Sequence, residues 1–247
     1  MNKSSSYLPC FFLVLPFMLV SCVLVVSTGT PGNKVIVTRE IPVTGYSSLQ
    51  VSVPGEIVYR QVTGDVPYCW VVTDENILSL LDIREEGGCL KIKVKRPGNI
   101  QPSRLTVETG SVRLDAVVLT GSGDVRLAGT VRGEGMAIRV TGSGDVTSED
   151  LYGEKTDLSV TGSGNIRLKG KCDRLSCVVT GSGDIHVYDY LARDARCSVT
   201  GSGTVHARAG ERLDAQVTGS GDIYYKGNPA RVTRRVTGSG GIKGIHD

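Results

Sequence analysis

The stretch VTGSGD, residues 140–145, recurs in close copies along the second half of the chain. The core tetrapeptide Thr-Gly-Ser-Gly begins at Thr120, Thr141, Thr161, Thr180, Thr200, Thr218 and Thr237, so successive copies lie 18 to 21 residues apart. A fixed period near 20 residues is typical of a solenoid, in which each unit buries its apolar face only by stacking on the next.

The residues before each threonine alternate in polarity. Apolar residues dominate one and three positions before it, as in Val140 and Ile138 or Val160 and Leu158, and mostly polar residues lie between them. This period of two predicts a half-buried strand. After the glycines the alternation resumes, with Val or Ile five positions past the threonine and a mostly polar residue six positions past it.

Each period therefore predicts a strand, a Gly-Ser-Gly corner, a second strand and a segment of variable sequence that leads to the next coil. We call this last segment the return. Each period leaves too little room for a helix in every return. The fold class that we expect is all-β, a parallel β-solenoid of about 20 residues per coil.

The Gly-Ser-Gly triplets fit the corners because glycine adopts backbone dihedrals that side chains resist and lets neighbouring coils approach closely. The predicted corner residues are Gly121, Ser122, Gly123, Gly142, Ser143, Gly144, Gly162, Ser163, Gly164, Gly181, Ser182, Gly183, Gly201, Ser202, Gly203, Gly219, Ser220 and Gly221.

The sequence divides into four parts. Residues 1–27 are expected to be an export signal, 28–33 a linker, 34–100 a strand-rich lead-in with a short helix or none, and 101–247 the repeat solenoid. Short β-branched runs separated by Gly, Pro or Asp predict the strands of the lead-in.

The first part has the pattern of a secretory signal. Lys3 precedes the apolar run FFLVLPFMLV, and Leu19-Val20-Ser21-Cys22 resembles a bacterial lipobox, which predicts cleavage before Cys22 and lipidation of its thiol. Cleavage further on, near VVSTG, and an uncleaved anchor are alternatives. All three place the body of the protein outside the cytoplasm.

The repeated VTGSGD and VTGSGN, with a lead-in such as GEIVYRQ and GGCLKIKVK, resemble the "putative auto-transporter adhesin, head GIN domain" family, found largely in exported proteins of Bacteroidetes. The resemblance covers roughly residues 35 to 243. It implies a β-solenoid of the periplasm or cell surface with an adhesion or binding role, and it supplies no catalytic residue.

A polar column is expected on the outside of the solenoid, directly after the corners. Its members are Asp124, Asp145, Asn165, Asp184 and Asp222, with Thr204 interrupting them. Carboxylates about 5 Å apart on adjacent coils have the separation found in retaining glycosidases, so a polysaccharide-active enzyme is one alternative. The neutral residues in the column instead favour a structural role, because they reduce the repulsion between stacked carboxylates. A cation site or a glycan site is a further alternative.

Aromatic and histidine side chains gather in the later coils. We expect these side chains to be exposed and to form a candidate glycan platform: His186, Tyr188, His206 and Tyr224. The simpler interpretation is that they are scattered surface residues without a binding role. Tyr225 falls in an inward column and is expected in the core.

Other chemistries have weaker support. The Gly-Ser-Gly triplets precede strands rather than helices, which disfavours phosphate binding, and six further copies of Ser182 argue against a singular nucleophile. We expect no catalytic residue, metal or cofactor. No clustered basic run suggests nucleic-acid binding.

Five cysteines lie beyond the signal: Cys69, Cys89, Cys172, Cys177 and Cys197. The odd number disfavours a complete disulfide framework. One period separates Cys177 from Cys197 in an inward column, so a disulfide is possible by distance, while two small core side chains are favoured.

The sequence thus predicts an exported, lipid-anchored, non-enzymatic adhesion or binding module, with a periplasmic structural or assembly factor as a further alternative. Its expected ligand is a glycan or an envelope protein, and its only membrane contact is the N-terminal lipid or anchor. No cap is evident for the last coil, which is expected to be protected by its charges or used in self-association.

Overall fold

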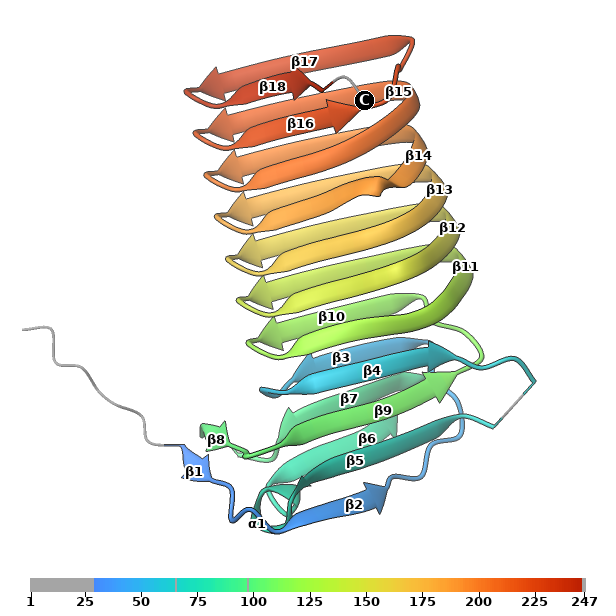
Figure 1. Cartoon of the computed structure of the whole chain (residues 1–247), viewed down its shortest axis with the longest axis vertical. Helices are drawn as coiled ribbons and strands as arrows, with labels where there is room; N and C mark the ends of the chain where they lie inside the picture. Colours follow the sequence, from blue (N-terminus) through green and yellow to red (C-terminus); the bar gives the residue numbers. More distant parts are fainter. Residues whose placement is uncertain (1–28, 65, 97, 246–247) are drawn as a thin grey trace, which may run out of the picture.

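Strands form on both sides of every Gly-Ser-Gly corner. The computed structural model describes residues 29–64, 66–96 and 98–245. Its repeat strands are β10 (Ala116–Gly121), β11 (Asp124–Gly142), β12 (Asp145–Gly162), β13 (Asn165–Gly181), β14 (Asp184–Gly201), β15 (Thr204–Gly219), β16 (Asp222–Lys226), β17 (Arg231–Gly238) and β18 (Gly241–Gly244). Each long strand begins after one corner, bends in the return and ends at the next corner, as Figure 1 shows.

The coils stack in parallel and in register. Val140 pairs with Val160 and Val160 with Val179, and the threonines and glycines of the corners pair in the same way. The stack has two sheet faces. The strand segments that precede the corners in the sequence form one face, and the segments that follow the corners form the other. The expected parallel β-solenoid is confirmed.

The core lies between the two faces and is built from the predicted inward columns. The residues one position before the threonines are 0–1% exposed from Leu119 to Val217, and those five positions after them are equally buried from Val125 to Ile223. The last coil differs, because Val236 is 45% exposed.

The lead-in supplies a coil of its own. Strands β3 (Ser48–Ser52) and β4 (Glu56–Gln61) pair in parallel with β10 and β11, so Glu56 lies opposite Asp124. On their other side they pair in parallel with β7 (Cys89–Val94) and β9 (Leu105–Ser111). The coil that comes first in the sequence is therefore inserted between two coils that come later.

Antiparallel strands close the base of the stack. β5 (Tyr68–Asp74) pairs with β9, β2 (Ile36–Glu40) pairs with β5, and β6 (Leu81–Glu86) pairs with β7. The only described helix is the single turn α1 (Glu75–Leu78), and β1 (Thr30–Pro31) pairs with β8 (Ile100–Gln101) beside the base. In the described part of the chain, no helix has the length and apolar character needed to cross a membrane.

Candidate functional site

The two glycines of each corner have different roles. The first adopts a positive φ, 120° at Gly181 and at Gly201, which disfavours any side chain. At the second, a Cβ on Gly183 would lie 2.2 Å from the Gly164 carbonyl oxygen of the coil beneath. The corner can therefore be turned and stacked only with glycine at both positions.

Backbone hydrogen bonds tie the corners together. The carbonyl oxygen of Gly142 accepts from the N–H groups of Ser163 and Gly164 at 2.8 and 2.9 Å, and the same pair of bonds recurs at each corner from Ser143 to Gly240. The six predicted corner serines are all exposed. These contacts assign the VTGSGD motif a scaffold role.

The polar column also takes part in stacking. Asp145 Oδ1 accepts hydrogen bonds from the backbone N–H and the side-chain amide of Asn165, at 2.9 and 2.8 Å. Asp124 and Asp184 accept in the same way from the backbone N–H groups of Asp145 and Thr204. Asp124 is exposed, whereas Asp145, Asn165, Asp184 and Asp222 are half-buried. The carboxylates therefore act as backbone caps from one coil to the next.

This role predicts different results for two substitutions of Asp145. We expect Asp145→Ala to lower the free energy of unfolding by about 1–2 kcal/mol, since the N–H of Asn165 loses its acceptor. Asp145→Asn keeps an acceptor oxygen and should cost less than half as much. Urea denaturation measures both variants, and equal losses would show that charge rather than the backbone bond matters.

An aromatic stripe runs up the outer surface of the later coils on the face after the corners. We define it as His186 and Tyr188 of β14, His206 of β15 and Tyr224 of β16. His186 pairs with His206, and His206 pairs with Tyr224. Parallel registration places such side chains about 4.8 Å apart, which allows flat rings to stack.

The rings of the stripe are in contact. The ring centroids of His186 and His206 lie 4.8 Å apart and nearly parallel, and those of His206 and Tyr224 lie 5.4 Å apart. Tyr188 meets His206 edge-on at 5.0 Å. All four side chains are half-buried rather than fully exposed, because each covers its neighbour.

Lysines border the stripe. Lys226 Nζ lies 5.4 Å from the ring centroid of Tyr188, and Lys243 Nζ lies 5.8 Å from that of Tyr224. Neither lysine was among the site residues expected from sequence. The signal for Lys226 is its position two residues after Tyr224 in one strand, which places both side chains on the same face.

The stripe histidines favour the neutral form. Burial and the nearby Arg167 lower the pKa of His186, although Asp184 and Asp145 act in the opposite direction. Burial and the neighbouring His186 lower the pKa of His206. Neutral imidazoles both donate and accept hydrogen bonds.

The pKa shifts predict that acid weakens the fold at the stripe. As the pH falls below the ordinary histidine value of 6.5, the unfolded chain takes up protons before the folded chain does, so stability is lost down to the folded pKa values. Thermal melts between pH 7.5 and 5 measure this loss. It should be smaller in the double variant His186→Gln/His206→Gln, and an identical pH dependence of the two proteins would contradict the assignment.

The five described cysteines are free thiols. Cys177 and Cys197 are register partners in the core, and their contact together with burial holds the pKa of Cys177 well above its ordinary value. Burial raises the pKa of Cys69 and of Cys172 to about 11. Thiols of this kind are unreactive core side chains.

The structure thus brings His186, Tyr188, His206 and Tyr224 into one surface and places the corner glycines and the polar column in the scaffold. Tyr225 is buried, as expected. The polar column also begins earlier than the repeats predict, because Glu56 lies opposite Asp124 and pairs with Arg126 at 3.2 Å. The sequence signal is Pro54-Gly55-Glu56-Ile57, a variant of Ser-Gly-Asp-Val. Cys22 lies outside the described residues.

Comparison with known proteins agrees with this architecture. Residues 45–229 match the family model described as "Putative auto-transporter adhesin, head GIN domain". The chain belongs to this family. No match is found among curated proteins.

Solved structures related to this head GIN domain chain share its fold. A putative adhesin from Bacteroides fragilis is 25% identical, with a TM-score of 0.84 over 88% of this chain and 100% of that one. A putative lipid binding protein from Parabacteroides distasonis is 30% identical, with a TM-score of 0.75 over 87% and 98%. A putative adhesin from the same organism is 26% identical, with a TM-score of 0.72 over 87% and 99%. The family and these neighbours indicate a binding module.

Proposed function

We propose that this head GIN domain chain is an exported, lipid-anchored, non-enzymatic adhesion module of the cell envelope, and that its aromatic stripe binds glycans. The stacked rings of His186, His206 and Tyr224 carry the proposal. They offer a flat apolar surface with polar atoms at its edge, which suits a sugar ring with C–H groups on one face and hydroxyl groups around its rim.

The place of the stripe in the fold supports this role. The stripe lies on β14–β16, toward the end of the rod opposite the base, whereas β1 lies beside the base (Figure 1). An anchor at Cys22 would hold the base near the membrane, because only seven residues lie between Cys22 and Thr30. The stripe would then lie toward the end of the rod that is remote from the membrane, where an adhesin meets its ligand.

The surrounding chemistry favours a neutral or weakly anionic glycan. The histidines are uncharged near neutral pH, and Lys226 and Lys243 border the rings. Tyr224 also donates a hydrogen bond to Asp222 at 3.3 Å, which helps to fix its ring.

Binding to immobilised hexasaccharides of glucose, mannose, galactose and N-acetylglucosamine tests the proposal. We expect at least one to bind with micromolar to millimolar affinity, and Tyr224→Ala to weaken it about tenfold, in line with the energy of one lost ring contact. The matched control is Tyr152→Ala, which removes a half-buried tyrosine that lies against Arg132 on another part of the surface.

Two results would contradict the proposal: no binding to any hexasaccharide, or equal loss in the Tyr224 and Tyr152 variants. Chromatography of the same mixtures detects cleavage products. Cleavage abolished by Asp124→Asn or Asp145→Asn would replace the binding module by a polysaccharide-active enzyme.

The anchor has a separate test. In a bacterial host that processes lipoproteins, the full chain should fractionate with membranes, and Cys22→Ala should release it or leave its signal uncleaved. Mass spectrometry should find an acylated Cys22 at the mature N-terminus. A mature chain that begins after Cys22 would disprove the lipid anchor without affecting the glycan site.

A further inference from the structure

The last coil leaves the end of the core uncovered. Every residue of β17 is exposed, including Val232 and Val236, which pair with the fully buried Leu213 and Val217 of the coil beneath. Among the described residues, no strand pairs with the outer edge of β17. The base, by contrast, is closed by antiparallel strands (Figure 1).

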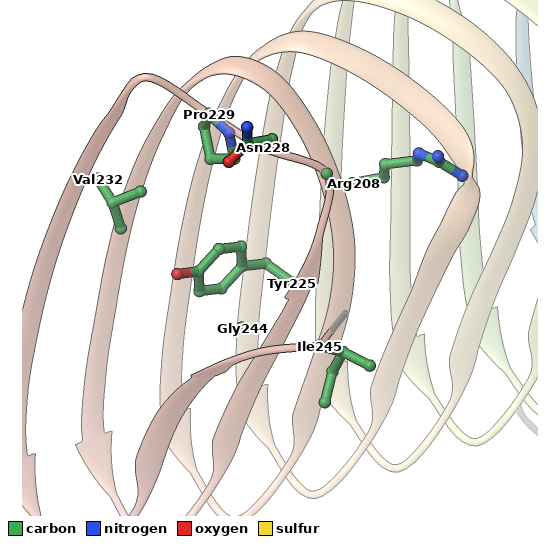
Figure 2. A pocket seen from close by; sticks show the side chains of 8 residues that line it. Arg208, Tyr225, Asn228, Pro229, Val232, Gly244 and Ile245 are labelled. Carbon is green, nitrogen blue, oxygen red and sulfur yellow. The ribbon is translucent and has the colours of Figure 1, made fainter. Parts of the chain in front are cut away.

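A pocket of about 600 Å³ opens at this end, a size typical of small-molecule sites. Its lining includes the apolar side chains of Tyr225, Val232 and Ile245 and the polar side chains of Arg208 and Asn228. In Figure 2 the ring of Tyr225 extends into the space between the strands, while the Arg208 side chain runs away from it. We call this pocket the C-terminal mouth.

One arginine occupies an inward position of β17, next to the mouth. Arg234 takes the place that Ala215 fills in the coil beneath, in a column that is otherwise apolar. Its guanidinium lies 5.2 Å from the ring centroid of Tyr225 and donates a hydrogen bond to the tyrosine hydroxyl. The guanidinium is thereby held beside Tyr225, one of the residues that line the mouth, with further N–H donors in a planar fork.

The described chain after Asp222 carries charge of one sign. Residues 223–245 contain five basic side chains and no acidic one: Lys226, Arg231, Arg234, Arg235 and Lys243. A second copy related by a two-fold axis would place the arginines of β17 against their own counterparts, which like-charge repulsion disfavours. The charge complements an anion, and the side chains of Tyr225, Val232 and Ile245 in the lining complement a hydrocarbon.

We propose that the C-terminal mouth binds a small amphiphilic anion, a carboxylate or phosphate monoester on a single alkyl chain. The head group pairs with Arg234, and the chain packs against Tyr225, Val232 and Ile245. This site is separate from the aromatic stripe, so it does not depend on the glycan proposal.

Calorimetric titration of the full chain with monomeric decanoate and decyl phosphate tests the site and distinguishes the two head groups. We expect one or both to bind in a 1:1 ratio. Inorganic phosphate should bind at least tenfold more weakly because it has no alkyl chain. Decyltrimethylammonium should also bind at least tenfold more weakly because its charge is opposite. Equal binding of the cationic amphiphile would overturn the proposal.

Variants locate the binding. Arg234→Gln retains a hydrogen-bond donor for Tyr225 but removes the charge, and it should weaken binding at least tenfold. The control is Arg139→Gln, which changes an exposed arginine on the same sheet face in an earlier coil and should leave binding unchanged. Val232→Asp should also abolish binding, and it serves as the test if Arg234→Gln disturbs the last coil.

Two further outcomes would also overturn the proposal. One is unchanged affinity in both mouth variants. The other is a concentration-dependent dimer in sedimentation that Arg234→Gln strengthens, which would assign the mouth to a second copy. Tyr224→Ala should leave decanoate binding intact, so failure at the stripe and failure at the mouth are distinguishable.

Discussion

Gly183→Ala is expected to destabilise the solenoid by about 3 kcal/mol, at the upper end of the range for overpacking. The new Cβ would lie 2.2 Å from the carbonyl oxygen of Gly164 and 2.7 Å from Cγ1 of Val160. The carbonyl oxygen cannot move away without separating two stacked coils, because both corners are fixed by backbone hydrogen bonds. Chemical denaturation followed by circular dichroism measures the loss.

Gly135→Ala is the matched control for this change. Gly135 lies in a return and does not have a positive φ, and a Cβ added there would meet no other atom within 4 Å. Its replacement should be neutral or stabilise by up to about 1 kcal/mol through the unfolded state. Equal effects of the two substitutions would show that coil contact at the corner is not what requires glycine.

Ile138→Asp is expected to prevent folding of the repeat region at 25 °C. Ile138 is fully buried in an inward column and pairs with Val117 and Leu158 of the adjacent coils. Burying an unpaired carboxylate there costs several kcal/mol, comparable with the whole stability of a domain. The β signal in circular dichroism and the elution volume in size exclusion should both report an unfolded or aggregated chain.

Arg139→Asp tests the same strand on its opposite side. Arg139 is exposed, so this variant should elute and melt like the parent to within a few degrees. A folded Ile138→Asp with a melting temperature close to that of Arg139→Asp would contradict the assignment of the inward column.

The sequence was sufficient to predict the coils because the same signal is repeated seven times. A single valine before a threonine says little about burial, whereas Val140, Val160 and Val179 at one repeat position define a core column. The aromatic stripe followed from the same alignment, since in-register stacking converts equal repeat positions into neighbours.

Three features were not predicted, each for a physical reason. The coil of β3 and β4 lacks the Thr-Gly-Ser-Gly signature, and its insertion between later coils depends on non-local pairing that no local pattern encodes. The half-burial of the stripe arises from ring contacts that depend on side-chain rotamers. The lack of a cap on the last coil was expected, but the pocket at the mouth depends on the placement of Tyr225, Val232 and Ile245, which periodicity alone does not reveal.

The most direct test of the binding account is nuclear magnetic resonance of histidine side chains during titration with a hexasaccharide that binds the chain. The chain has three histidines, and His186→Gln and His206→Gln assign the two stripe signals. The account predicts that the imidazole resonances of both His186 and His206 shift with the same saturation curve as the binding isotherm. Saturated binding that leaves both resonances unmoved would contradict it.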